Sequence, residues 1–295
     1  MAVLVWFYLV MKPTHRRAAR YVTALFAVVA TVFVALPSSL AQPPTVTQPS
    51  PTVPVTSAPA GPGSDRGPDK LQPDGTSAVD FRVPVDNEIV RLRTHFTVPP
   101  KPPRVGTLFL WPGVEPRPDG RNYEPIGLGV LQPVLTWGPS CAPTRQPPAY
   151  STWWISGQYV NVGNDPRYEG CHSGTAMSVK VGEVLDIDIA LDPASGRWQQ
   201  TITGQSGSVR YSINMRGQAQ NRALFAVEPW DNAQYGGPLL FSDTTIDFRN
   251  AGRQSCLDPH VVYIGAGGRI SQPTALDERR CHIDTVSVNS RRTVE

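Results

Sequence analysis

One carboxylate lies inside an otherwise apolar, strand-like run of the sequence. The run 223–230 reads Ala-Leu-Phe-Ala-Val-Glu-Pro-Trp, and Glu228 shares one face with Leu224, Ala226 and Trp230 if the side chains alternate as in a strand. A carboxyl group on such a face is partly desolvated, which raises its pKa and suits it to general acid or base catalysis. The alternative is a glutamate at a strand end whose side chain bends toward solvent.

One glutamine stands out for the same reason. Gln132 lies in the run 127–137, and its neighbours on the same face are Val130 and Val134. A glutamine amide can donate a hydrogen bond to an oxyanion that develops during acyl transfer. The alternative is an amide that bonds to a neighbouring backbone group. Together, Gln132 and Glu228 are the candidate catalytic residues.

Other catalytic motifs are missing from the sequence. It has no Gly-x-Ser-x-Gly elbow, no His-Glu-x-x-His and no phosphate-binding glycine loop followed by Lys-Ser/Thr. We therefore do not expect a serine or cysteine hydrolase. Asp186 and Asp188 share a strand face, which would suit a glycosidase, but such a pair is more typical of a solvated face.

The cysteines favour an exported protein with disulfide bonds. The chain has 4 cysteines, which allow three pairings. We favour Cys141–Cys171 and Cys256–Cys281, because each closes a loop of about 25 to 30 residues and contributes about 3 kcal/mol. Histidines follow two of the cysteines, but no Cys-x-x-Cys or His-x-x-x-His spacing accompanies them, so we expect no metal site.

The N-terminal segment has the features of a signal peptide. An uncharged stretch, 21–36, follows a basic region, and Ser39-Leu40-Ala41 offers a cleavage site before Gln42. The stretch is shorter than the roughly 20 residues that span a bilayer, although an uncleaved anchor is the alternative. Translation starting at Met11 is also possible. We expect a secreted chain, either free or associated with a cell wall, with no membrane span after cleavage.

Composition restricts the rest of the chain. Of 27 Lys and Arg residues, 4 precede residue 42, which leaves 23 against 24 Asp and Glu, or about −1. This balance gives no electrostatic case for binding nucleic acid. The 31 Pro and 25 Gly residues oppose a helical bundle. Pro recurs among Thr, Ser and Val over 42–76, which predicts a disordered linker.

From residue 77 the pattern is that of an all-β domain. Runs of period two, separated by turn signals, predict an antiparallel β-sandwich or barrel with no convincing amphipathic helix. The runs cover 106–111, 126–137, 151–162, 181–191, 198–203, 208–215, 222–228, 239–248 and 282–288. We expect Val181 to lie on the same strand face as Leu185 and Ile187.

Several of these segments together resemble the glutamic peptidases, or eqolisins. In order, the segments begin at Trp111 (Trp-Pro-Gly-Val), Gly129 (Gly-Val-Leu-Gln-Pro-Val), Ser151, Ser178, Trp198, Ala223 (Ala-Leu-Phe-Ala-Val-Glu) and Leu239. The resemblance covers about residues 105–248 and implies a concanavalin-like or jelly-roll sandwich. Residues 249–295 lie beyond it and are expected to form a C-terminal extension that packs on the sandwich.

The resemblance also implies a mechanism. Glu228 would be the general base on a water molecule and then the acid to the leaving amine, and Gln132 would stabilise the oxyanion, at acidic pH and without metal or cofactor. The substrate would be a polypeptide and the protein a monomer. The chain departs from the family at Pro133 and Val134, where the family has Thr-Gly, and at Ile155, where the family has an acidic residue.

The tryptophans suggest a second function. The expected substrate-binding residues are Trp111, Trp153, Trp154 and Trp230. If such rings stack on sugars instead, the domain is a non-catalytic carbohydrate-binding module. For most of the tryptophans, core packing is the simpler explanation. The peptidase hypothesis requires Gln132 and Glu228 within a few ångströms of each other on adjacent strands of one sheet, in a groove open to solvent.

Overall fold

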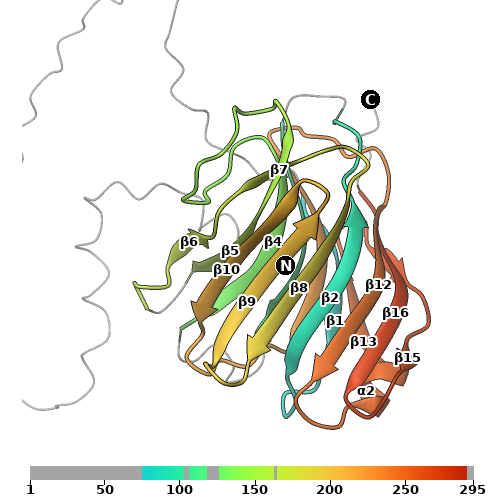
Figure 1. Cartoon of the computed structure of the whole chain (residues 1–295). Coiled ribbons are helices and arrows are strands. Elements are labelled where there is room, and N and C mark those ends of the chain that lie inside the picture. The colour runs from blue at the N-terminus through green and yellow to red at the C-terminus, as the bar shows by residue number, and fades with distance from the viewer. Residues whose placement is uncertain (1–74, 103–105, 118–125, 163–164, 291–295) are drawn as a thin grey trace, which may run out of the picture. The chain divides into compact units, whose positions relative to one another are not determined.

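A computed structural model describes residues 75–102, 106–117, 126–162 and 165–290. The expected signal peptide, 1–41, and the linker up to residue 74 lie outside the described residues. The described chain folds into two antiparallel sheets, here called sheet A and sheet B, which face each other as a β-sandwich (Figure 1). The predicted fold class is therefore confirmed.

Sheet A contains the candidate residues. Its strand order is β13 (His260–Ile264), β1 (Ser77–Arg82), β11 (Arg222–Trp230), β3 (Thr107–Glu115), β4 (Leu128–Trp137), β5 (Trp153–Val162) and β6 (Gly170–Ser173), and β7 (Met177–Val179) also pairs with β5. Strands β3, β4 and β11 are buried along nearly their whole length. Burial on both faces explains why these runs are almost continuously apolar.

Sheet B lies in front in Figure 1 and has the more usual alternation. Its order is β10 (Gly207–Asn214), β9 (Arg197–Gly204), β8 (Val184–Asp192), β2 (Ile89–Thr97), β12 (Leu239–Phe248), β16 (Arg280–Val288) and β14 (Gly268–Ile270), and β15 (Thr274–Ala275) pairs with β16. Leu185 and Ile187 are buried as expected, whereas Val181 lies before β8 and is half exposed, so that part of the prediction is wrong.

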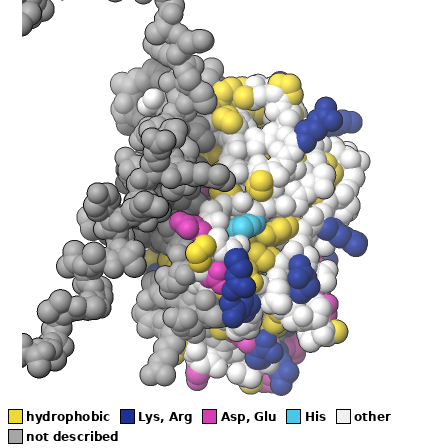
Figure 2. Space-filling model, turned by 90° about the vertical axis from the view of Figure 1, so that its left-hand side faces the viewer, with side chains coloured by type: hydrophobic (Ala, Val, Ile, Leu, Met, Phe, Trp, Pro, Cys, Tyr) yellow, Lys and Arg dark blue, Asp and Glu magenta, His cyan; other side chains and the backbone are white. Residues whose placement is uncertain are grey.

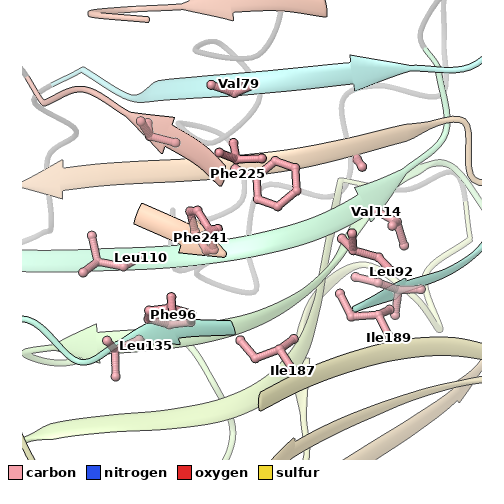
Figure 3. Close-up of a cluster of buried hydrophobic side chains, with 14 of the residues drawn as sticks. Val79, Leu92, Phe96, Leu110, Val114, Leu135, Ile187, Ile189, Phe225 and Phe241 are labelled. Carbon is pink, nitrogen blue, oxygen red and sulfur yellow. The ribbon is translucent and has the colours of Figure 1, made fainter. Parts of the chain in front are cut away.

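The core lies between the two sheets. Figure 3 shows Val79, Leu110, Leu135 and Phe225 of sheet A pointing toward residues of sheet B that include Phe96, Ile187 and Phe241. The ring of Phe241 lies 5.3 Å from that of Phe96 and 5.0 Å from that of Phe225, measured between ring centroids. Aromatic contacts of this kind join the two layers at their centre.

The segment 249–295 was expected to be an extension that packs on a finished sandwich. Its strands instead belong to the two sheets. It supplies β13, which pairs with β1 at the edge of sheet A, and β16, which lies between β12 and β14 in sheet B. It also contains α2 (Arg253–Leu257), a five-residue helix that the strand pattern did not predict. Both sheets are therefore incomplete without this segment.

Both predicted disulfide bonds are present. Cys141 and Cys171, with Cα atoms 5.9 Å apart, join the loop 138–152 to β6. Cys256 and Cys281, with Cα atoms 5.4 Å apart, join α2 to β16. These bonds agree with an extracellular location, where disulfides persist. Among the described residues, no helix is long and apolar enough to cross a membrane.

Candidate active site

Gln132 and Glu228 lie on the same face of sheet A. Their neighbours Leu131 and Val227 belong to the core between the sheets, so both polar side chains point the opposite way, onto what we call the outer face of sheet A. The two residues are on β4 and β11, and β3 lies between these strands. The expectation of adjacent strands is therefore wrong, because one strand separates them. The expected groove open to solvent is not found either, because both side chains are buried.

A small cavity on the outer face connects the two residues. It is lined by Phe109, Trp111, Gln132, Val134, Ser140, Cys141, Gln158, Val160 and Glu228. The space open to a water-sized sphere is about 10 Å³, which is roughly what one water molecule requires. The strands of sheet A contribute three polar side chains to the cavity wall, those of Gln132, Gln158 and Glu228. A water molecule in the cavity would therefore contact two amides and a carboxyl group.

Two indole groups hold the Glu228 carboxyl group. Trp230 Nε1 donates to Oε1 at 2.9 Å, and Trp111 Nε1 donates to Oε2 at 3.1 Å. Burial raises the pKa of Glu228 to about 7, because desolvation penalises the charged form more than the two hydrogen bonds favour it. The carboxyl group is therefore fixed in orientation and gains or loses its proton near neutral pH.

The Gln132 amide has an unused hydrogen-bond acceptor. Its Oε1 atom is buried and has no hydrogen-bond partner. Gly113 on β3 lies beside it: a Cβ atom added there would lie 2.8 Å from the Leu131 carbonyl oxygen and 3.3 Å from Gln132 Cβ. Residue 113 therefore has no room for a side chain, because β4 packs closely against β3 beside Gln132.

The four predicted substrate-binding tryptophans occupy different positions. Trp111 and Trp230 contact Glu228, as described above. Trp154 has its indole N–H on the carbonyl oxygen of Gly138 at 3.0 Å. Trp153 lies in the core between the sheets, 5.5 Å from the ring of Trp137, which does not support its predicted role. All four rings are buried, with no more than 2% of their surface exposed, so none offers an open face for stacking on a sugar.

The loop 138–152 forms part of the cavity wall. Ser140 and Cys141 line the cavity. The Gln146 side chain braces this stretch, because it accepts from the Ser140 backbone N–H at 3.1 Å and donates to the carbonyl oxygens of Ser140 at 2.9 Å and Ala142 at 3.0 Å. The Cys141–Cys171 bond ties the same loop to β6. Hydrogen bonds and a disulfide bond therefore fix this part of the cavity wall.

Sequence reasoning missed Gln158, which lies directly opposite Gln132 in the pairing of β4 with β5. It too is a polar residue in a buried strand, so the argument that found Gln132 would have found it.

A second buried carboxyl group was also missed. Burial raises the pKa of Glu115 to about 7 although Arg222 pairs with it, and Arg222 also binds Asp80, with 2.8 Å between Nη2 and Oδ2. Neither Glu115 nor Arg222 lines the cavity.

The other candidates from the sequence lie elsewhere. Asp188 pairs with Arg91 at 2.7 Å and Asp186 with Arg93 at 3.9 Å on the exposed face of sheet B, in agreement with a solvated face. In the described part of the chain, no group of three or more His, Cys, Asp or Glu side chains is placed to hold a metal ion. On the side of the molecule in Figure 2, basic and acidic side chains are scattered together.

Comparison with known proteins gives a likeness in structure alone. No family model and no curated protein matches the sequence. Scytalido-glutamic peptidase in complex with a peptide-based transition-state analogue matches at 11% identity and a TM-score of 0.47, over 75% of this chain and 100% of that one. Another eqolisin, in complex with the tripeptide Ala-Ile-His, matches over the same shares at 11% identity and a TM-score of 0.44.

A lectin is also similar. Peanut lectin with a nine-residue peptide matches over 78% of this chain and 96% of that one, at 11% identity and a TM-score of 0.28. At these identities and TM-scores the likenesses concern the sandwich architecture and say nothing about chemistry.

Proposed function

We propose that this protein hydrolyses peptide bonds, with Glu228 as the general base and acid and Gln132 as the group that stabilises the oxyanion. The observation that carries this proposal is the environment of the Glu228 carboxyl group. It is buried, held by two indole N–H groups, given a pKa of about 7 by desolvation, and placed on the same cavity as an amide with an unpaired oxygen. The sequence resemblance points to the same two residues.

Glu228 is suited to both halves of such a reaction. Each carboxyl oxygen accepts one indole N–H, which leaves a lone pair on each for a water molecule. As the carboxylate, Glu228 takes a proton from the water while the water oxygen attacks the carbonyl carbon of the substrate. As the acid, it then gives that proton to the amine nitrogen as the C–N bond breaks.

Gln132 supplies the complementary groups. Its Nε2 can donate to the oxyanion that forms when the carbonyl carbon becomes tetrahedral, and its Oε1 can accept a hydrogen bond from the attacking water. Loss of one oxyanion donor typically lowers kcat about 100- to 1,000-fold.

The pKa of Glu228 sets the pH range. The base form is the minor form below pH 7, so kcat/KM should rise with pH and level off above about 7. The proposal thus places activity near neutral pH, in contrast to the acidic range implied by the family resemblance.

The test is hydrolysis of a denatured protein by the purified full chain between pH 4 and 9, with and without a chelator. We expect Glu228→Gln and Gln132→Leu to reduce cleavage at least 100-fold. Glu115→Gln is the matched control, because it makes the same change at another buried carboxyl group with a raised pKa outside the cavity. Undiminished cleavage by folded Glu228→Gln would overturn the proposal.

A further inference from the structure

Gln158 forms a pair with Gln132 that the proposed reaction does not use. The two residues are Cα partners on the neighbouring strands β4 and β5, and both line the cavity with Glu228. Directly opposed residues of an antiparallel pair have Cβ atoms about 5 Å apart. Two primary amides therefore stand side by side on one face, next to the candidate base.

The Gln158 amide is held in one orientation. Its Nε2 donates to Ser156 Oγ at 3.1 Å, two residues earlier on the same face of β5. This bond uses one of the two N–H groups of Nε2 and leaves the carbonyl oxygen Oε1 as the acceptor for a ligand N–H. The buried Oε1 of Gln132, which has no partner, is a second acceptor across the strand pair. With Gln132 Oε1 facing the attacking water, Gln158 Oε1 is the acceptor that matches an N–H group of a peptide chain.

The backbone of Gln158 is held from the other sheet. Gln200 on β9 accepts from the Gln158 N–H through Oε1 at 3.1 Å and donates to its carbonyl oxygen through Nε2 at 2.7 Å. These contacts lie where β5 changes its partner strand, since it pairs with β7 up to Ile155 and with β6 from Gln158 onward. The Gln200 side-chain amide thus takes the place of a neighbouring strand's backbone at this point of β5. It fixes the backbone position of Gln158.

We propose that Gln158 binds a main-chain N–H of the polypeptide substrate beside the scissile bond, and that Gln200 is its positioning residue. This inference rests on the proposed function for the identity of the substrate. It adds a second amide to the site, whose task is to bind and orient the chain, whereas Gln132 acts on the oxyanion.

Kinetics give the first test. For Gln158→Met we expect KM for a peptide substrate to rise about 5- to 10-fold with kcat within twofold, the effect of one lost neutral hydrogen bond. Gln200→Met should raise KM in the same direction with kcat again preserved. Gln199→Met, an exposed neighbour of Gln200 on β9, is the matched control and should change neither constant. An unchanged KM in folded Gln158→Met would overturn the inference.

A binding experiment separates this inference from the proposed function. In the full Glu228→Gln chain, a blocked tripeptide amide should shift the side-chain amide NMR signals of Gln132 and Gln158, and adding Gln158→Met should weaken its Kd about 5- to 10-fold. If wild type hydrolyses no peptide but these shifts occur, the proposed function fails and the inference stands. If wild type hydrolyses peptides but Gln158→Met leaves the Kd unchanged, the inference fails and the proposed function stands. NMR shifts that only a trisaccharide produces would also overturn the inference.

Discussion

Trp230 donates its indole N–H to Oε1 of Glu228 at 2.9 Å, although only one residue separates them on β11. Side chains two residues apart in a strand lie on the same face. The strand therefore supplies the carboxyl group together with one of its two hydrogen-bond donors, and Trp111 on β3 supplies the other at 3.1 Å. The position of Glu228 thus depends on two strands that are hydrogen-bonded to each other.

This contact predicts the pH dependence of a variant. Desolvation raises the pKa of Glu228, and the hydrogen bond from Trp230 lowers it. Trp230→Phe removes that donor, so we expect the pKa to rise and the ascending limb of kcat/KM to move up by about one pH unit. Trp154→Phe is the control, because the Trp154 indole bonds to a backbone carbonyl oxygen instead. A limb that moves equally in both variants would contradict the assignment.

Stability should fall as the pH rises from about 4.5 to about 7. In this range an unfolded glutamate has lost its proton, whereas buried Glu228, with a pKa of about 7, retains it. Raising the pH therefore favours the unfolded chain, by up to about 3 kcal/mol for this group. Glu228→Gln should remove that share of the slope. Urea unfolding at several pH values measures it, and an unchanged slope in the variant would contradict a raised pKa.

Gly129 should tolerate no side chain. A Cβ atom there would clash with the hydroxyl group of Tyr159, a buried residue whose hydroxyl has no hydrogen-bond partner. We expect Gly129→Ala to lower the free energy of unfolding by about 1 to 3 kcal/mol. Gly236→Ala, where the added atom meets open space, is the control. Tyr159→Phe should not rescue Gly129→Ala, because the ring carbons Cζ and Cε2 of Tyr159 also overlap the added atom. Rescue by Tyr159→Phe would contradict this contact.

The two disulfide bonds should have separable roles. Each closes a loop of similar length, 30 and 25 residues, so removal of either should cost about 3 kcal/mol of stability. Cys141 lines the cavity, whereas Cys256 and Cys281 do not. We expect replacement of Cys141 and Cys171 by Ser to change KM for a peptide, and replacement of the other pair to leave it unchanged. Peptide hydrolysis well below both melting temperatures measures the difference.

Much of the fold follows from local patterns. Alternation predicted most of the strands, and it placed Gln132 and Glu228 on faces that carry Val134 and Ala226, as the structure has them. The disulfide pairing followed from loop length. These predictions succeed because side-chain direction and loop closure depend on residues near each other in sequence.

Features that depend on strand order were not predictable. Sequence alternation does not reveal that β3 lies between β4 and β11, because the neighbours of a strand are set by long-range pairing. The opposite roles of Trp153 and Trp154 have the same origin. Their alternation is evident, but whether a given face of β5 meets sheet B or the cavity depends on the assembled sandwich. The indole contacts of Glu228 likewise follow from the register of β11 on β3.

The placement of β16 has a consequence for biosynthesis. This strand occupies an interior position of sheet B, between β12 and β14, and β13 completes the edge of sheet A. During synthesis and export, β12 remains an unpaired edge on one side until residue 288 has emerged. Exposed edges of this kind promote pairing between chains. The nascent protein should therefore depend on chaperones or rapid translocation for longer than a sandwich whose sheets close in chain order.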